Sequence, residues 1–490
     1  MVTESVTYGE RKGRPKKSYL LSYLAENRKM LISKRVVKIA KKNLLSYHTH
    51  TTYNMGFDAC VRKGAEYIKS LKECVIVTHY DCDGLSSGVI LAHALKRRNT
   101  DFSLFVVKEL TREVIERIND FCLPVIFADL GESRLVDEVK MPVVILDHHS
   151  PVDFNKKDII HVNPELYGIH ELTGSCVAYL VAKALDSENE TLADIAITGA
   201  AGDVKLDSLR ESELGKEIIN DALKRRVVRI ETGLRLFGYA SRPLHKALEY
   251  CFDPYIPGIS GNESAAVQML SELGIEIKKG ERFRTLSELS EEERIKLHTH
   301  LVMLRLSHNM EKPEDIFGEN YILTRYNYEV REMATILNAF GRLERFNDAF
   351  KLYTEFDRNL AEEVISEYKT RLARYISVAE QLVREGGIIA TIEGQNLIEP
   401  NFVSPVSTIF SQSVKAKILV VSAYDRDEVK ISIRNRTEIP VNEIARKVSE
   451  ELGGEGGGHI EACGARVGID REKEFLERFE SEIRKYRAEN

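Results

Sequence analysis

Histidine and aspartate alternate in the segment Val77-Thr78-His79-Tyr80-Asp81-Cys82-Asp83-Gly84, and this pattern suits metal chemistry. His79, Asp81 and Asp83 stand two positions apart, so in extended backbone their side chains project from one side. One neutral imidazole with two carboxylates is a ligand set for Mn²⁺ or Mg²⁺, and Mn²⁺ tolerates the nitrogen better. Taken alone, the segment is also compatible with an Asx-rich turn between a strand and a helix.

Three later segments carry the same kinds of side chain after apolar or small residues. Asp129 follows one apolar run, Asp147-His148-His149 follow another, and Asp203 follows the small residues 199–202. An isolated buried charge is unfavourable unless it is compensated, so these groups are expected to compensate one another. If the four segments converge, they supply enough ligands for two metal ions.

The elements that would position these side chains follow from the apolar pattern. Helical spacing occurs at Phe57–Lys69, Gly88–Arg98 and Glu113–Phe121. Compact apolar runs, typical of strands buried on both faces, occur at Cys74–Val77, Ser103–Val107, Pro124–Phe127 and Val143–Leu146. This alternation predicts a doubly wound parallel sheet, in which ligands bind beyond the carboxyl ends of the strands.

The pattern changes after about residue 250. Residues 263–312 have helical patterns, with N-terminal caps expected at Thr285 and Ser290, and Arg358–Arg384 predicts one extended helix. Strands are expected at Ile418–Ser422 and Val429–Ile433, followed by a helix near Val441–Leu452 and a glycine loop. We therefore predict an α/β protein with a basic N-terminal extension (1–56), a catalytic domain (57–250), a helical insertion (251–330), and a linker helix with a smaller α/β domain (331–490).

Composition favours a soluble protein. Apolar residues make up 43% and charged residues 30% of the chain, and no run of about 18 uncharged apolar residues occurs. We therefore expect a cytoplasmic protein without membrane contact. The seven cysteines form no CxxC pair, which argues for reduced thiols. The net charge is −6, but residues 1–45 hold twelve Lys and Arg against three acids; this segment either neutralises phosphates, docks a protein partner or is a solvated tail.

We call the four segments that contain these candidate metal ligands the metal-type segments. In their order along the chain they resemble the motifs of the DHH phosphoesterase family, whose name matches Asp147-His148-His149. The resemblance covers about residues 75–205 for these motifs. It implies two Mn²⁺ ions per active site, with Mg²⁺ as the alternative. It also implies that Asp147 orients its neighbouring histidine and that His149 donates to the scissile phosphate. The implied ligands are His79 and Asp81 for one ion, Asp83, His148 and Asp203 for the other, and Asp129 as the bridge.

Two further segments resemble the parts of this family that bind nucleic acid. The stretch 453–459 and the preceding Arg434 resemble the DHH-associated C-terminal domain, and Leu337-Asn338-Ala339-Phe340-Gly341-Arg342 resembles the LNAxGR motif of RecJ-type members. The first resemblance implies that the terminal nucleotide and its phosphate are held by Arg434, Gly457, Gly458 and His459. The second implies that Asn338 and Arg342 contact the strand backbone.

We therefore predict an exonuclease that hydrolyses single-stranded DNA or RNA to mononucleotides by a two-metal mechanism, in DNA replication or repair. Segments 172–179 and 234–244 resemble archaeal RecJ-like proteins, which implies GINS or a Hef-type helicase-nuclease as partner. Tyr239 and Phe340 are candidates for base stacking, although core packing explains them better. The alternatives are a phosphodiesterase for short oligoribonucleotides (nanoRNA) or cyclic dinucleotides, and an inactive replication scaffold. The complete metal set favours an enzyme, while polarity, DNA or RNA preference and oligomeric state stay open.

Overall fold

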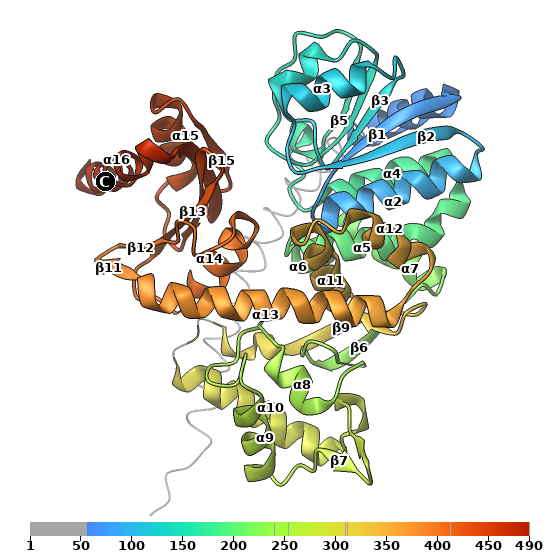
Figure 1. Cartoon of the computed structure of the whole chain (residues 1–490). Helices are drawn as coiled ribbons and strands as arrows, with labels where there is room; N and C mark the ends of the chain where they lie inside the picture. The colour runs from blue at the N-terminus through green and yellow to red at the C-terminus, as the bar shows by residue number, and fades with distance from the viewer. Residues whose placement is uncertain are drawn as a thin grey trace, which may run out of the picture.

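The computed structural model describes residues 56–490 apart from 240, 253, 309, 311, 412 and 490 (Figure 1). The predicted basic extension therefore lies outside the described residues, except for Gly56. A long helix, α13 (Arg358–Leu382), starts near a parallel-sheet unit and ends near a mixed-sheet unit. In the view of Figure 1 both units lie above this helix, and the helical insertion lies below it.

The parallel-sheet unit contains five strands in the order β2-β1-β3-β4-β5, all parallel. Every residue of β3 and β4 is buried, because helices cover both faces of the sheet. The strands are β1 (Glu73–His79), β2 (Asp101–Val107), β3 (Val125–Ala128), β4 (Val143–Leu146) and β5 (Ile159–Val162). The four strands predicted from the sequence are confirmed, and β5 was not predicted.

Helices on the two faces of this sheet have separate cores. One core contains a helix over residues 56–70 together with α2 (Cys82–Arg97), α4 (Gly174–Leu185) and α5 (Ala193–Gly202). The other contains α3 (Arg112–Asn119) and a 3-10 turn, η1 (Arg134–Glu138). Asp81 begins α2 by accepting the backbone N–H of Gly84 at 3.0 Å, so the first metal-type segment forms the helix cap.

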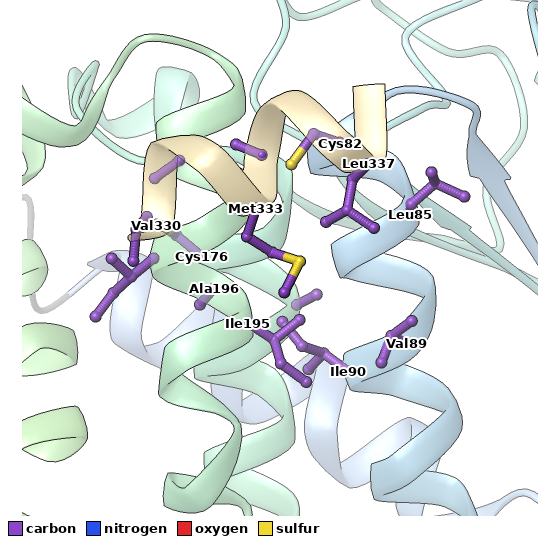
Figure 2. Packing of buried hydrophobic residues seen from close by; sticks show 14 of the residues in the cluster. Cys82, Leu85, Val89, Ile90, Cys176, Ile195, Ala196, Val330, Met333 and Leu337 are labelled. Carbon is purple, nitrogen blue, oxygen red and sulfur yellow. The ribbon is translucent and has the colours of Figure 1, made fainter. Parts of the chain in front are cut away.

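A further helix, α11 (Val330–Arg342), packs against α2 and α5 (Figure 2). Its Met333 and Leu337 side chains point toward the cluster that contains Leu85, Val89 and Ile195 (Figure 2). This apolar contact places the end of α11 beside the start of α2, and therefore beside the first metal-type segment. The helices α6 (Leu206–Glu211) and α7 (Glu213–Lys224) pack against α5, and α12 (Phe346–Thr354) packs against α11 and α2.

The insertion shares a separate apolar core with the residues directly before it, 234–251. Thr285 and Ser290 both form capping boxes, with Glu288 and Glu293, as the sequence predicts. A three-stranded antiparallel sheet, which the sequence pattern did not predict, joins the insertion to the rest of the chain. The elements are β6 (Val228–Leu234), α8 (Leu244–Glu249), α9 (Glu263–Glu272), β7 (Lys278–Lys279), β8 (Arg282–Phe283), α10 (Glu291–Ser307), β9 (Phe317–Leu323) and β10 (Tyr328–Glu329).

The mixed-sheet unit contains six strands in the order β11-β12-β13-β14-β16-β15. The predicted glycine loop is wrong in part, because Glu455–Gly458 forms the edge strand β15, whose backbone pairs with β16. The strands are β11 (Arg384–Gly386), β12 (Ile389–Glu393), β13 (Ile418–Asp425), β14 (Glu428–Asn435), β15 and β16 (Ala462–Gly468), and the helices are α14 (Val403–Ser411), α15 (Val441–Glu451) and α16 (Glu472–Glu489).

The α/β fold class is confirmed, with a parallel sheet, a helical insertion and a smaller C-terminal α/β unit. The domain boundaries given above stay a prediction. No helix within the described residues is long and apolar enough to cross a membrane.

Candidate active site

The metal-type side chains converge at one edge of the parallel sheet. His79 ends β1, Asp129 follows β3, and Asp147 follows β4, all at the carboxyl ends of their strands. Asp203 reaches the same edge as the residue that ends α5. From β1 the chain adds β2 on one side and then β3, β4 and β5 on the other, so the strand order reverses between β1 and β3, which is where ligands bind in doubly wound sheets.

These side chains form two adjacent groups, His79-Asp81-Asp129 and Asp83-His148-Asp203, and Asp129 also groups with His148 and His149. In the first group, His79 Nδ1 lies 2.8 Å from Asp81 Oδ2 and 3.7 Å from Asp129 Oδ2. In the second, His148 Nε2 lies 3.3 Å from Asp129 Oδ1. The same nitrogen lies 3.2 Å from Asp203 Oδ2 and 3.9 Å from Asp83 Oδ2. The structure therefore brings together all six residues to which the family resemblance assigns a metal ion.

The charges of the two groups fit divalent cations. Burial raises the pKa of Asp83, and the nearby Asp129 and Asp203 raise it further. Burial lowers the pKa of His148, but the carboxylates of Asp129 and Asp203 outweigh this effect and the pKa is raised. Protons therefore stay bound where the carboxylates repel one another, and divalent cations in the same place would relieve that repulsion. In addition, the buried atoms His79 Nδ1, Asp129 Oδ1 and His148 Nε2 have no hydrogen-bond partner in good geometry among the described residues.

Asp129 adopts a backbone conformation that non-glycine residues rarely use. Its φ is 55°, in the left-handed region, and the side chain is 1% exposed. Val204, directly after Asp203, has a φ of 60°. Such strain persists where the surrounding structure imposes it, and it is frequent at functional sites.

Two hydroxyl groups donate hydrogen bonds to Asp83, and sequence reasoning did not assign these hydroxyls a role. Thr173 Oγ1 donates to Asp83 Oδ1 at 2.7 Å, and Ser175 Oγ donates to the same oxygen at 2.5 Å. Gly199 permits this packing, since a Cβ there would lie 2.5 Å from Asp83 Oδ1. Thr173 and Ser175 fall in segment 172–179, whose only signal in the sequence is its family resemblance.

Asp147 organises the turn that carries both histidines. Its Oδ1 accepts the backbone N–H of His148 at 2.7 Å and lies 2.7 Å from His149 Nδ1. The His149 side chain is 48% exposed, whereas that of His148 is 2% exposed, so only His149 is open to a substrate. Burial lowers the pKa of His149, but Asp147 outweighs it and the pKa is raised. A protonated His149 is suited to donate to a phosphate oxygen.

Glu132 and Asn163 stabilise this turn through hydrogen bonds, and nothing in the sequence pattern indicated either residue. Asn163 Nδ2 donates to Glu132 Oε1 at 2.6 Å and to the carbonyl of His149 at 2.9 Å. Glu132 also accepts the backbone N–H of Val152 at 2.8 Å. The position of His149 is therefore fixed from its ring and from its backbone.

The LNAxGR-like segment contacts the first metal-type segment directly. Asn338 Oδ1 accepts the backbone N–H of Cys82, between two metal-type aspartates, at 2.9 Å. Gly341 lies so close to the carbonyl of Tyr80 that a Cβ there would overlap the oxygen. The end of α11 thus holds the backbone that carries Asp81. A contact of Asn338 with a nucleic-acid strand stays a prediction.

A cleft of about 420 Å³ lies between the candidate ligands His79 and Asp129 and the β15 hairpin. Burial lowers the pKa of His459, and Lys205, His148 and His149 lower it further. The predicted site residues that line the cleft are His79, Asp129, Asp147 and His149 on one wall and Gly458 and His459 on the other.

Arg434 and Arg342 lack acidic partners among the described residues, although neither lines this cleft. Arg434 Nη2 donates to Ser404 Oγ at 2.9 Å, and burial lowers the pKa of Arg434 to about 10. Arg342 donates to the carbonyl of Asn401 at 3.1 Å, and its Nε is buried without a partner. In the described part of the chain, no carboxylate lies within ion-pair distance of either guanidinium. Desolvated arginines of this kind are suited to bind a phosphate.

Three other candidates from the sequence are core residues. Tyr239 is 6% exposed and Phe340 is fully buried, which confirms that both pack in the core. Cys82 is 1% exposed, and burial raises its pKa well above the ordinary value. A buried protonated thiol is a packing residue and not a nucleophile.

Comparison with known proteins agrees with this geometry. Family profiles match residues 73–200 as the DHH family N-terminal domain, residues 236–316 as the DHH-CID domain and residues 387–485 as the DHHA1 domain. An uncharacterised protein of Methanocaldococcus jannaschii is 31% identical over 427 residues, which cover 83% of this chain and 92% of the relative.

Solved structures share the fold at low identity. CDC45 of Entamoeba histolytica matches with a TM-score of 0.58 and 12% identity, over 88% of this chain and 98% of that chain. RecJ of Thermus thermophilus, in complex with Mn²⁺, matches with a TM-score of 0.54 and 16% identity, over 86% of this chain. This chain spans only 54% of the length of that RecJ. The chain is therefore a phosphoesterase of the DHH family with a RecJ-like hydrolase fold.

Proposed function

We propose that the protein is a two-metal exonuclease that removes mononucleotides from one end of single-stranded DNA or RNA. The observation that carries this proposal is one cleft with His79, Asp129 and His149 of the candidate ligand cluster on one wall and Glu455, Gly458 and His459 of the β15 hairpin on the other. His79, Asp81 and Asp129 would hold one ion. Asp83, His148 and Asp203 would hold the other, again with Asp129. The imidazole ligands favour Mn²⁺ over Mg²⁺.

A bound pair of divalent ions supplies a nucleophile at neutral pH and stabilises charge on the attacking and leaving oxygens. The protein's own residues perform the remaining tasks. His149, held by Asp147, donates a hydrogen bond to a non-bridging oxygen of the scissile phosphate. The backbone of Gly457 and Gly458, together with His459 and Arg434, holds the terminal nucleotide and its phosphate. Arg342 binds the backbone of the strand, and the narrow cleft excludes a duplex.

Action in DNA replication or repair, and association with GINS or a Hef-type helicase-nuclease, form a separate part of the proposal. They rest on the resemblance of segments 172–179 and 234–244 to archaeal RecJ-like proteins. Co-purification with candidate GINS and Hef-type proteins tests this part, and a protein that binds neither contradicts it. Enzymatic activity does not depend on the result.

The activity is tested with oligonucleotides of about 30 nucleotides, DNA and RNA in parallel, labelled at either end and incubated with Mn²⁺. We expect mononucleotides to be released from one end first, and Asp83→Ala to be inactive. Asp153→Ala, which removes an exposed carboxylate outside the ligand groups, is the matched control and is expected to retain activity. Survival of long strands with cleavage of dinucleotides would favour a short-oligonucleotide phosphodiesterase, and no cleavage at all would contradict the enzyme proposal and reopen the scaffold hypothesis.

A further inference from the structure

A row of charged residues crosses the mixed sheet on the face that adjoins α14. Directly paired residues of antiparallel strands share a face, so Glu455, Arg466 and Lys430 form this row across β15, β16 and β14. Arg466 is engaged by acids, with Nη1 3.2 Å from Asp425 and Nε 3.5 Å from Glu109 of the parallel-sheet unit. Within the described residues, Lys430 has no carboxylate at ion-pair distance. The row therefore contains one cation that is open to a ligand.

The next row on the same face, which we call the bare strip, carries almost no side chains. It consists of Gly457, Gly464 and Ser432, paired in that order. A Cβ on Gly457 would meet nothing within 4 Å, so this glycine faces open space, and the Ser432 hydroxyl lies 2.9 Å from that of Ser407 on α14. Beyond this bare strip stands Arg434, the next residue of β14 on that face. The strip thus separates two cations on one strand.

The strip is the floor of a cavity of about 290 Å³. Lys430, Gly457 and Gly464 line it, and Glu455 lines both this cavity and the cleft that faces the metal-type groups. The rise of a strand places Lys430 and Arg434 roughly 13 Å apart, with the bare row halfway between them. A strand of nucleic acid that leaves the cleft would therefore meet the strip next.

The surroundings of Lys430 favour an anion. Burial lowers the pKa of Lys430, Tyr80 and Asp425 act in the opposite direction, and the nearby Arg466 and Arg342 lower it further, so that the pKa is lowered overall. A desolvated cation beside other cations is unfavourable until a negative group joins it. A phosphate of the strand would supply that charge without any change in the fold.

We propose that this strip is a second nucleotide subsite, in which Lys430 binds a backbone phosphate beyond the one held by Arg434. This inference rests on the proposed function and names its substrate class, a single strand with two or more phosphates. The sugar or base of the intervening nucleotide lies on the glycine backbone. Because the strip has no side chain that reads base edges, the subsite is neutral to sequence.

The test is a binding measurement in EDTA, so that no hydrolysis occurs. Fluorescent single strands of about 12 nucleotides, DNA and RNA separately, are titrated by anisotropy over a series of salt concentrations. Lys430→Ala is expected to weaken binding about tenfold and to lower the slope of log K against log salt by about 0.7. Lys430→Arg is expected to restore both. Lys417→Ala, which removes an exposed cation from the same unit, is expected to change neither.

A 5′-mononucleotide serves as the short ligand, and its affinity is expected to be lowered far less by Lys430→Ala than that of the long strand. The thermal midpoint of each variant establishes that it is folded. Equal affinities and salt slopes for Lys430→Ala and Lys417→Ala would overturn the subsite. This outcome is distinct from a failure of the exonuclease proposal, because the binding measurement gives a result whether or not the wild-type protein cleaves strands with Mn²⁺.

Discussion

Removing the side chain of Asn338 tests whether α11 supports metal binding from outside the ligand set. In Asn338→Ala, the N–H of Cys82 loses a side-chain acceptor at 2.9 Å, in a residue that is 1% exposed. An unsatisfied buried N–H costs about 1–3 kcal/mol. If the first metal-type segment relaxes in the metal-free variant, it must be reordered when the ion binds. The energy of that reordering then weakens the metal affinity. We therefore expect the dissociation constant for Mn²⁺ to rise about 10- to 100-fold.

The assay is calorimetric titration of the metal-free protein with Mn²⁺ at constant pH. Asn338→Asp retains an acceptor oxygen and is expected to recover most of the affinity. Thr335→Ala, on the same helix, removes only a hydroxyl that donates to the carbonyl of Arg331 and is expected to match the wild type. Wild-type metal affinity in Asn338→Ala together with weaker strand binding in EDTA would refute the reasoning. Asn338 would then act as the direct strand contact that the family resemblance implies.

Three further perturbations have expected outcomes. Ser175→Ala removes a hydroxyl that donates to Asp83 and is expected to weaken Mn²⁺ binding about tenfold in the same titration; an unchanged affinity would contradict the supporting role of the hydroxyl. Mn²⁺ at about 100 times its dissociation constant is expected to add about 2.7 kcal/mol to the free energy of unfolding, raising the thermal midpoint, while Asp129→Ala shows no such rise. Burial raises the pKa of Asp194 to about 7, so its proton stabilises the fold at low pH, and about 4 kcal/mol is lost as the pH rises from about 4 through 7. Asp194→Asn should not incur this loss, so its thermal midpoint is expected to rise relative to the wild type between pH 5 and pH 8; parallel pH profiles would contradict it.

The sheet that presents the metal-type groups was largely predictable, because fully buried strands are short, continuous apolar runs. The missed strand is β5, an edge strand with three of its four residues only half-buried. Its Ile159-Ile160-His161-Val162 sequence therefore lacks a strong pattern. The glycine strand β15 was expected to be a loop because glycine disfavours strands. Pairing with β16 outweighs that preference, and local sequence does not report such pairing.

The ligand set was predictable because each acid or histidine follows an element that brings it to the same edge. The supporting contacts were not. Asn338 and Cys82 are 256 positions apart in the chain, and Glu132 and Asn163 are common residue types in unremarkable surroundings. Lys430 gave no signal either, since its role depends on which residues of β15 and β16 lie beside it. Only the three-dimensional pairing of strands identifies these residues.

The length of the long helix α13 determines how the two walls of the cleft are rotated relative to each other about the helix axis. Its 25 residues span roughly 37 Å, and each residue turns the helix by about 100°. A single inserted residue would swing the mixed sheet around the helix axis and carry Arg434 and His459 away from His149. An insertion of seven residues would nearly restore the angle but would displace the sheet by about 10 Å. Length differences among relatives are therefore expected in the loops of the insertion, where the angle between the walls is unaffected, and not within this helix.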